Sequence, residues 1–268
     1  MTIQVRILGC GSSGGVPRLG EGGPNWGVCD PANPRNRRLR CSVLATQRSA
    51  SGETRVLVDT SPDLREQLLG TGTGHLDGVI LTHDHADHTH GLDDLRPLTI
   101  LMRRRIRVFA EPVTAQSMMS RFSYCFVQPE GSGYPPILNL ITSAIGAPIE
   151  IDGGGGPLAF TTFRLIHGDV DVLGLRVNGC AYTPDVSAIP DESLAALSGL
   201  DTWIIDCLRP ARHPTHFSLD EALEWIGRMK PRRAVLTNLH TDLDYASLSR
   251  MVPGHITVAY DGLELTLP

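Results

Sequence analysis

Histidine and aspartate side chains crowd one short segment of the chain. The sequence HDHADH places four candidate metal ligands within six residues, namely His83, His85, Asp87 and His88. His83 and His85 are two residues apart, so in an extended stretch their side chains face the same side. Imidazole nitrogen and carboxylate oxygen are donors that zinc, manganese and iron accept. The segment therefore predicts a metal site rather than a solvated polar loop.

Four more candidate residues each follow or end an apolar extended run, as this segment does. They are His167, Asp185, His240 and Asp59. Strand ends project side chains into the crevices where functional sites are built. A single histidine at such a place is more often a packed or surface residue. Several such positions beside the cluster instead favour one shared site.

The hydrophobic pattern indicates which elements must position these residues. Strands are expected over residues 2–8, 42–47, 54–58, 78–82, 106–109, 158–166, 172–177, 180–183, 202–206, 233–238 and 255–260. Helices are expected over residues 62–69, over 112–122, and from the capping box at 218–221 onward. Residues 20–40 and 123–157 are rich in Gly and Pro and are expected to be loop. This order predicts an α+β chain of two halves whose sheets pack on each other.

Composition narrows the class of protein. The 268 residues include 28 Gly and 19 Pro, which favours many short elements joined by turns over a long-helix bundle. Apolar residues make up 41%, enough for a sizeable core and too many for wholesale disorder. The net charge of −5 argues against a general nucleic-acid coat protein. No stretch approaches the roughly 18 consecutive apolar residues of a membrane span. The six cysteines form no C-x-x-C pair, so we expect reduced thiols and a cytoplasmic protein.

The order of the candidate ligands resembles that of the metallo-β-lactamase-fold hydrolases. The resemblance is carried by the H-x-H-x-D-H motif of residues 83–88, then a distant His, an Asp and a last His. The glycine-rich start GCGSSGGVP and the sequence DTSPD of residues 59–63 extend it over nearly the whole chain. β-Lactamases of this fold carry Cys where Asp185 stands, and its flavo-diiron oxidoreductases carry Glu where His85 stands. Neither pattern is present.

Within this superfamily the chain is most similar to the phosphonate-pathway cyclic-phosphate phosphodiesterases, which are themselves related to the tRNA 3′-processing endonucleases. The segments that carry this narrower resemblance are Arg40-Cys41-Ser42, Asp206-Cys207 and the HFSLD of residues 216–220. The resemblance implies a single four-layer αββα sandwich over residues 1–268, made of two α/β halves.

The resemblance also implies a centre of two divalent metal ions, and the donor types admit zinc, manganese or iron. It assigns three ligands to each ion and one that bridges both: His83, His85 and His167; Asp87, His88 and His240; and the bridging Asp185. Asp59 and Asp63 are expected to orient the ligand loops by hydrogen bonds.

The chemistry expected of such a centre is phosphodiester hydrolysis. A metal-bridging hydroxide would attack the phosphorus of a small cyclic phosphate or nucleotide. His216 matches the catalytic histidine position of the family and is the expected proton donor to the leaving oxygen, with His213 as its rival. Asp185 would take part through its bridging position.

Substrate contacts are expected from the glycine-rich turn and from the first basic run, at Ser12, Ser13, Arg40 and Ser42, and from His213. The runs at residues 35–40 and 103–107 otherwise predict solvated faces. RNA is an alternative partner, although no long basic, glycine-rich arm for tRNA is visible. Ester, lactone or thioester hydrolysis on the same centre is another alternative, and a homodimer stays open.

Overall fold

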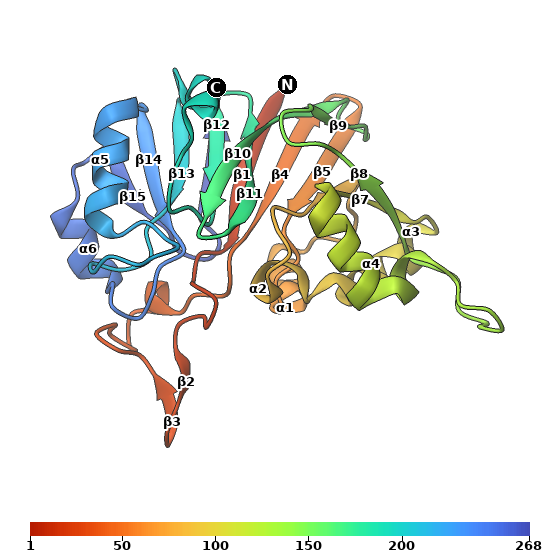
Figure 1. Ribbon diagram of the computed structural model, residues 1–268, viewed down its shortest axis with the longest axis horizontal. Coiled ribbons are helices and arrows are strands. Elements are labelled where there is room, and N and C mark those ends of the chain that lie inside the picture. Colours follow the sequence, from red (N-terminus) through yellow and green to blue (C-terminus); the bar gives the residue numbers. More distant parts are fainter.

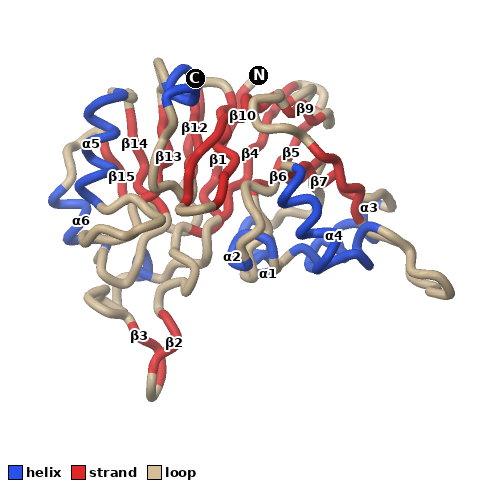
Figure 2. Tube along the Cα trace, in the orientation of Figure 1, coloured by secondary structure: helices blue, strands red, loops and turns tan.

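Two seven-stranded sheets pack face to face in the middle of the molecule. The computed structural model describes residues 1–268. Figure 1 shows helices on the outer side of each sheet, and the tube in Figure 2 shows the same arrangement of helix, sheet, sheet and helix. The α+β class and the four-layer αββα order predicted from the sequence are therefore confirmed.

The first sheet combines an antiparallel and a parallel half. Its order is β16 (Glu264–Leu267), β1 (Thr2–Gly9), β4 (Ser42–Ser49), β5 (Gly52–Val58), β6 (Gly78–Ile80), β7 (Ile106–Ala110) and β8 (Leu138–Thr142). The strands are antiparallel from β16 to β5 and parallel from β5 to β8. The short β6 is buried at all three residues, as a central parallel strand covered on both faces must be.

The second sheet repeats this plan with other strands. Its order is β15 (Ile256–Val258), β14 (Arg233–Thr237), β13 (Thr202–Asp206), β12 (Cys180–Thr183), β11 (Val170–Val177), β10 (Leu158–His167) and β9 (Ile149–Ile151). The strands from β9 to β12 are antiparallel, and those from β12 to β15 are parallel. Each sheet therefore has a row of parallel strands whose carboxyl ends can carry a site.

Helices cover the outer face of each sheet. The first sheet is covered by α1 (Leu64–Thr71), α3 (Arg96–Met102) and α4 (Pro112–Phe126), and the second by α5 (Leu219–Met229) and α6 (Tyr245–Met251). Three short 3-10 helices are η1 (Pro34–Asn36), η2 (Leu92–Leu95) and η3 (Asp191–Leu197). The capping box predicted for α5 is present, because the Ser218 hydroxyl accepts from Glu221 N at 3.4 Å and Glu221 Oε2 accepts from Ser218 N at 2.9 Å. None of the helices combines the length and the apolar character needed to cross a bilayer.

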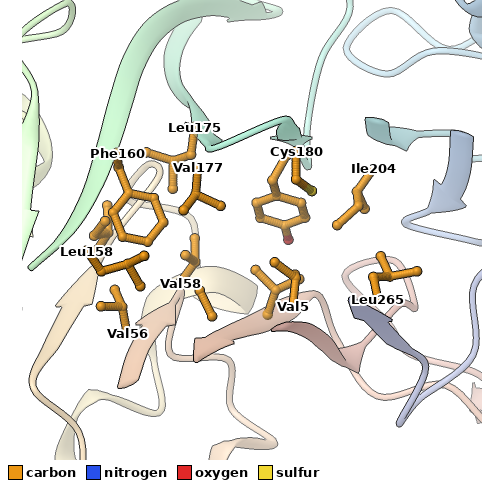
Figure 3. Close-up of a cluster of buried hydrophobic side chains, with 14 of the residues drawn as sticks. Val5, Val56, Val58, Leu158, Phe160, Leu175, Val177, Cys180, Ile204 and Leu265 are labelled. Carbon is orange, nitrogen blue, oxygen red and sulfur yellow. The ribbon is translucent and has the colours of Figure 1, made fainter. Parts of the chain in front are cut away.

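The central core lies between the two sheets. Val58 and Leu265 of the first sheet face Phe160 and Ile204 of the second, and all four are buried (Figure 3). Burial of one such side chain contributes about 1.5–3 kcal/mol to the free energy of unfolding. The contact between the sheets therefore stabilises the edge where their loops meet. Two further apolar clusters fill the space between each sheet and its helices.

The expectation of loop over residues 123–157 was wrong. α4 continues to Phe126, and β8 and β9 both fall in this range, each at an edge of its sheet. Edge strands this short carry little periodicity, and the surrounding Gly and Pro residues masked them. In the other Gly-rich stretch the structure forms a small hairpin of β2 (Arg18–Gly20) and β3 (Gly23–Asn25), which projects away from the sheets (Figure 1).

Candidate metal centre

Polar side chains from both sheets meet where the parallel strands end. They lie at the end of β5, β6, β12, β13 and β14 or within the next three residues: Asp59, His83, Asp185, Asp206 and Asn238. β10 is antiparallel to its neighbours and ends at His167 beside them. The short helix α2 (Ala86–Thr89), a few residues beyond β6, presents Asp87 and His88. The carboxyl ends of the two sheets therefore share one site.

Four of the predicted ligands form a first group. The ligand atoms of His83, His85, His167 and Asp185 all lie within 4.8 Å of one another. Asp185 Oδ2 lies 3.7 Å from His167 Nε2 and 3.8 Å from His83 Nε2. The His167 ring is fixed because its Nδ1 donates to the Thr215 carbonyl, which leaves Nε2 facing the group.

A second group contains Asp87, His88 and the same Asp185. His88 Nε2 lies 3.3 Å from Asp185 Oδ1 and 3.5 Å from Asp87 Oδ2. The structure thus brings six of the seven predicted ligands together, and it places Asp185 between the two groups as expected of a bridging carboxylate.

The two groups fit divalent metal ions. His83 Nε2 and His88 Nε2 are buried and make no hydrogen bond, although buried polar atoms normally have a partner. Each faces carboxylate oxygen in a donor set that zinc, manganese or iron accepts. Burial and the neighbouring His88 hold the pKa of His83 well below its ordinary value, so His83 is in the neutral form that binds metal.

Asp59 lies behind the ligand loop and holds it in place. Its Oδ1 accepts from Thr82 N at 2.8 Å, and its Oδ2 accepts from the Thr82 hydroxyl at 2.9 Å. The same Oδ2 lies 2.7 Å from His88 Nδ1. A proton on Nδ1 directs the lone pair of Nε2 toward the centre, so Asp59 sets both the tautomer and the orientation of His88.

A second histidine–aspartate pair comes from the other sheet. His216 Nδ1 lies 2.9 Å from Asp206 Oδ2, and His216 Nε2 lies 3.9 Å from Asp185 Oδ2. Burial alone would lower the pKa of His216, but the Asp206 carboxylate raises it to about 9. His216 therefore offers a proton toward the first group. His213 lies farther out, with its ring centroid 5.2 Å from that of His216.

His240 is the predicted ligand that the structure does not bring into either group. β14 ends at Thr237, and the chain turns at Asn238, which has a left-handed φ of 61°. His240 falls in the next turn, where its Nδ1 lies 3.0 Å from Asp242 Oδ2. Its assignment to the second ion is corrected accordingly.

Two other expectations are corrected by the contacts of the side chains. Asp63 does not touch a ligand loop but binds Arg40, at 2.8 Å to Nε, 2.6 Å to Nη2 and 2.9 Å to the backbone N. The Ser42 hydroxyl is fully buried and donates to the carbonyls of Val58 and Asp59 at 3.0 and 2.9 Å. Ser42 thus fastens two strands and is not a substrate contact.

Asn238 and the pairing role of Asp206 were missed in the sequence. Asn238 Nδ2 lies 3.2 Å from Asp185 Oδ1 and 3.0 Å from Asp206 Oδ1. The available signal was position, since both residues stand where an apolar run ends. Amide side chains are so common at strand ends that the sequence alone did not single this one out.

A pocket of about 570 Å³ has a lining that includes Ser13, Gly14, Arg18 and Arg40. The hydrogen bonds with Asp63 raise the pKa of Arg40, and the Asp87 carboxylate of the second group adds a smaller effect in the same direction. A Cβ at Gly9 would lie 2.1 Å from the Arg40 carbonyl, so the glycine-rich turn packs directly on this segment.

The remaining basic run lies at the opposite end of the first sheet. Arg104 binds Asp77 at 2.7 Å, immediately before β6 begins, and Arg107 donates to the Asp152 carbonyl at 3.1 Å. Residues 103–107 therefore face away from the candidate centre.

Known proteins share this architecture. Residues 54–238 match the beta-lactamase superfamily domain. A crystallised diphosphatase of the PhnP family superposes with a TM-score of 0.86 and 33% identity, over 100% of this chain and 98% of that one. The short form of human tRNase Z superposes with a TM-score of 0.64 and 17% identity over 99% of each chain, a likeness of fold.

In sequence the chain is similar to the octanoyltransferase of Porphyromonas gingivalis, with 34% identity over 263 residues. The match covers 96% of this chain but only 50% of that protein, so the chain spans half the length of this relative. The matched family, the shared architecture and the His/Asp groups agree, and the chain belongs to the beta-lactamase superfamily and has the metallo-β-lactamase fold.

Proposed function

We propose that this chain is a metal-dependent hydrolase that cleaves phosphodiester bonds in a small cyclic phosphate or nucleotide. The observation that carries the proposal is the placement of His216. Its Nδ1 is held by Asp206 at 2.9 Å, while its Nε2 faces the bridging Asp185 at 3.9 Å. A proton donor thus points at the ligand groups, where the departing oxygen of a bound phosphodiester would need it.

The proposed cofactor is a pair of divalent ions, zinc or manganese before iron, held by the two ligand groups. When bound, such ions lower the pKa of water and polarise a phosphate oxygen. Asp59 and Thr215 fix the rings of His88 and His167, so the ligands are oriented before an ion arrives. Asp185 is a participant through its contact with both groups.

The arginine-lined pocket supports an anionic substrate. Arg18 and Arg40 line it together with Ser13, and Arg40 is held in a fixed direction by Asp63. A guanidinium binds phosphate through paired N–H donors, so these arginines would hold a part of the substrate that does not react. Ser12 is buried with an unpaired hydroxyl, and it stays a proposed contact together with His213.

A second candidate reaction is hydrolysis of a phosphoanhydride. It is favoured by the full-length likeness to a diphosphatase of the PhnP family at 33% identity. The same ligands and pocket would serve, but a phosphate leaving group needs a proton donor less than an alkoxide does. The two reactions can therefore be separated by how strongly each depends on His216.

Two further alternatives follow from the relatives. The likeness to tRNase Z raises precursor tRNA as a substrate, and the name of the octanoyltransferase raises acyl esters and thioesters. We favour a small phosphate because the arginine-lined pocket suits an anion. Six free, buried cysteines support the proposal of a cytoplasmic location, and a homodimer stays a proposal that sedimentation would test.

The test compares two substrates on the metal-loaded protein and on His216→Ala. Bis-p-nitrophenyl phosphate has a leaving group that needs little protonation, whereas a 2′,3′-cyclic nucleotide releases an alkoxide. If His216 is the acid, kcat for the cyclic nucleotide falls by about 10²–10⁴-fold and that for the nitrophenyl ester falls much less. Metal content should not change. His213→Ala tests the rival acid and should not reproduce this difference between the two substrates.

Equal losses on both substrates would remove His216 from the acid role. Faster turnover of a nucleoside diphosphate than of any diester would move the conclusion to phosphoanhydride hydrolysis. Turnover of precursor tRNA or a thioester alone would overturn both proposals.

A further inference from the structure

The two ligand groups share Asp185 but face different oxygens of its carboxylate. Oδ2 faces the first group, at 3.7 Å from His167 Nε2 and 3.8 Å from His83 Nε2. Oδ1 faces the second group, at 3.3 Å from His88 Nε2. The two groups can therefore be compared donor by donor.

The second group has fewer donors than the first. The first offers three imidazoles and one carboxylate, whereas the second offers one imidazole and two carboxylates. Structural zinc sites have four protein ligands and catalytic ones three, so by this count the first group is closed and the second keeps an open position. His240 does not fill the gap, because its ring is paired with Asp242 at 3.0 Å.

Asn238 occupies the side of Asp185 where a further ligand would stand. It is only 2% exposed, and its Nδ2 lies 3.2 Å from Asp185 Oδ1 and 3.0 Å from Asp206 Oδ1. The Pro184 carbonyl is also within 3.4 Å of this nitrogen. An amide nitrogen surrounded by acceptors is a hydrogen-bond donor and cannot bind a metal ion.

We propose that the two ions bind with unequal affinity: the first group binds one ion tightly, and the second binds an exchangeable ion. Asn238 causes the difference, because it supplies no ligand and donates to the Asp185 oxygen that the second ion needs. This inference rests on the metal binding proposed above. It adds a chemical preference, since the imidazole-rich group suits zinc and the carboxylate-rich group suits manganese or magnesium.

The expected difference in affinity between the two ions can be estimated from the loss of metal affinity that follows the removal of a group near a metal ion. Removal of an outer hydrogen-bond partner of a ligand costs about 10–100-fold in metal affinity, and one ligand fewer costs no less, so we expect dissociation constants at least about 10-fold apart. An ion that weak is lost on gel filtration, whereas the first ion is retained.

The experiment uses metal-free full-length protein titrated with Zn²⁺ and, separately, with Mn²⁺. Isothermal titration calorimetry gives the two affinities, and mass spectrometry of the metals after gel filtration gives the retained ions. The native protein should retain one equivalent of zinc. Asn238→His adds an imidazole beside Asp185 Oδ1 and should make the second equivalent stay bound. His240→Ala is the matched control and should leave both affinities unchanged.

The outcomes separate this inference from the proposed function. Two equally tight ions in the native protein would overturn the inference alone, as would loss of an ion in His240→Ala. A protein that binds no ion would overturn the metal-dependent function as well. If Asn238→His does not fold, as judged by circular dichroism, Asn238→Ala replaces it. The second ion should then bind no more weakly than in the native protein, and a tenfold loss would show that the amide is a ligand.

Discussion

The two sheets each place a buried aspartate behind a histidine at the shared edge, and the two pairs serve different ends. In the first sheet, Asp59 follows β5 and lies 2.7 Å from His88 Nδ1. In the second, Asp206 ends β13 and lies 2.9 Å from His216 Nδ1. Both aspartates are fully buried, and both turn the Nε2 of their histidine toward Asp185.

The difference lies in what surrounds each Nε2. His88 Nε2 has carboxylate oxygens of Asp185 and Asp87 within 3.5 Å, so it can share an ion with them. His216 Nε2 lies 3.9 Å from Asp185 and belongs to neither ligand group, which leaves it free to hold a proton. One local device, a carboxylate that fixes a ring, thus gives a ligand or an acid according to how many further donors lie nearby.

The largest effect should come from His83→Ala, which removes a buried ligand on the first-sheet side. The first ion would lose one of three imidazoles, so we expect loss of the retained zinc and of at least about 10³-fold in turnover. Metal analysis after gel filtration checks the first point and initial rates check the second. A variant that kept its zinc would show that His83 is only packed at this edge.

Asp59→Asn should weaken metal binding without removing a ligand. The amide can no longer hold His88 in one tautomer as a carboxylate does, and such partners are worth about 10–100-fold in metal affinity. Titration calorimetry measures the change. Recovery of turnover at saturating metal would confirm that Asp59 acts through the ligand, and failure to recover would contradict it.

Asp206→Asn should spare the metal and slow the chemistry. His216 would lose the carboxylate that orients it, so we expect kcat on a cyclic nucleotide to fall by about tenfold, a part of what a general acid contributes. Metal analysis distinguishes the two variants, because Asp206→Asn should keep its metal whereas Asp59→Asn should bind it more weakly. If Asp206→Asn instead lost metal, the division between the two pairs would fail.

The smallest effect concerns Asp261, a half-buried aspartate with no histidine partner. Its oxygens accept from Cys10 N at 3.1 Å and Leu39 N at 2.7 Å, and burial raises its pKa to about 7. The folded state therefore holds a proton that the unfolded state releases near pH 4, so this group costs stability as the pH rises from about 4 to 7. The slope is at most about 1.4 kcal/mol per pH unit.

Thermal unfolding between pH 5 and pH 8 would measure this slope, and Asp261→Asn should flatten it while turnover stays unchanged. An equal slope in both proteins would mean that Asp261 stays charged at pH 5. Asp261 would then not contrast with the two aspartates that are paired with a histidine.

The ligand cluster and most strands could be predicted from the sequence because each rests on a local pattern. HDHADH directly follows an apolar run, and the structure places its first histidine just beyond β6. β8 and β9 could not be predicted in this way, because they are short edge strands whose pairing depends on distant residues. The same limit applies to α3 and α6, which pack on sheets that the local sequence does not reveal.

The error at His240 has a more specific cause. The sequence predicts a strand that extends to residue 238, shortly before His240. Histidine is the usual metal-binding residue type, so the sequence places His240, rather than Asn238, at the centre. In the structure β14 ends at Thr237, and the first residue beyond it, Asn238, faces the site. A difference of one residue at a strand end thus decides which side chain reaches the centre.

The last strand has a consequence for how the chain assembles. β16 pairs with β1, and Val5 lies opposite Leu265, so one edge of the first sheet joins residues about 260 positions apart. During synthesis β1 presents an open edge until β16 emerges, and open edges invite pairing with other chains. Contacts this distant in sequence also form slowly. The first sheet is therefore complete only after β16 has been made, although its ligand loop is made early.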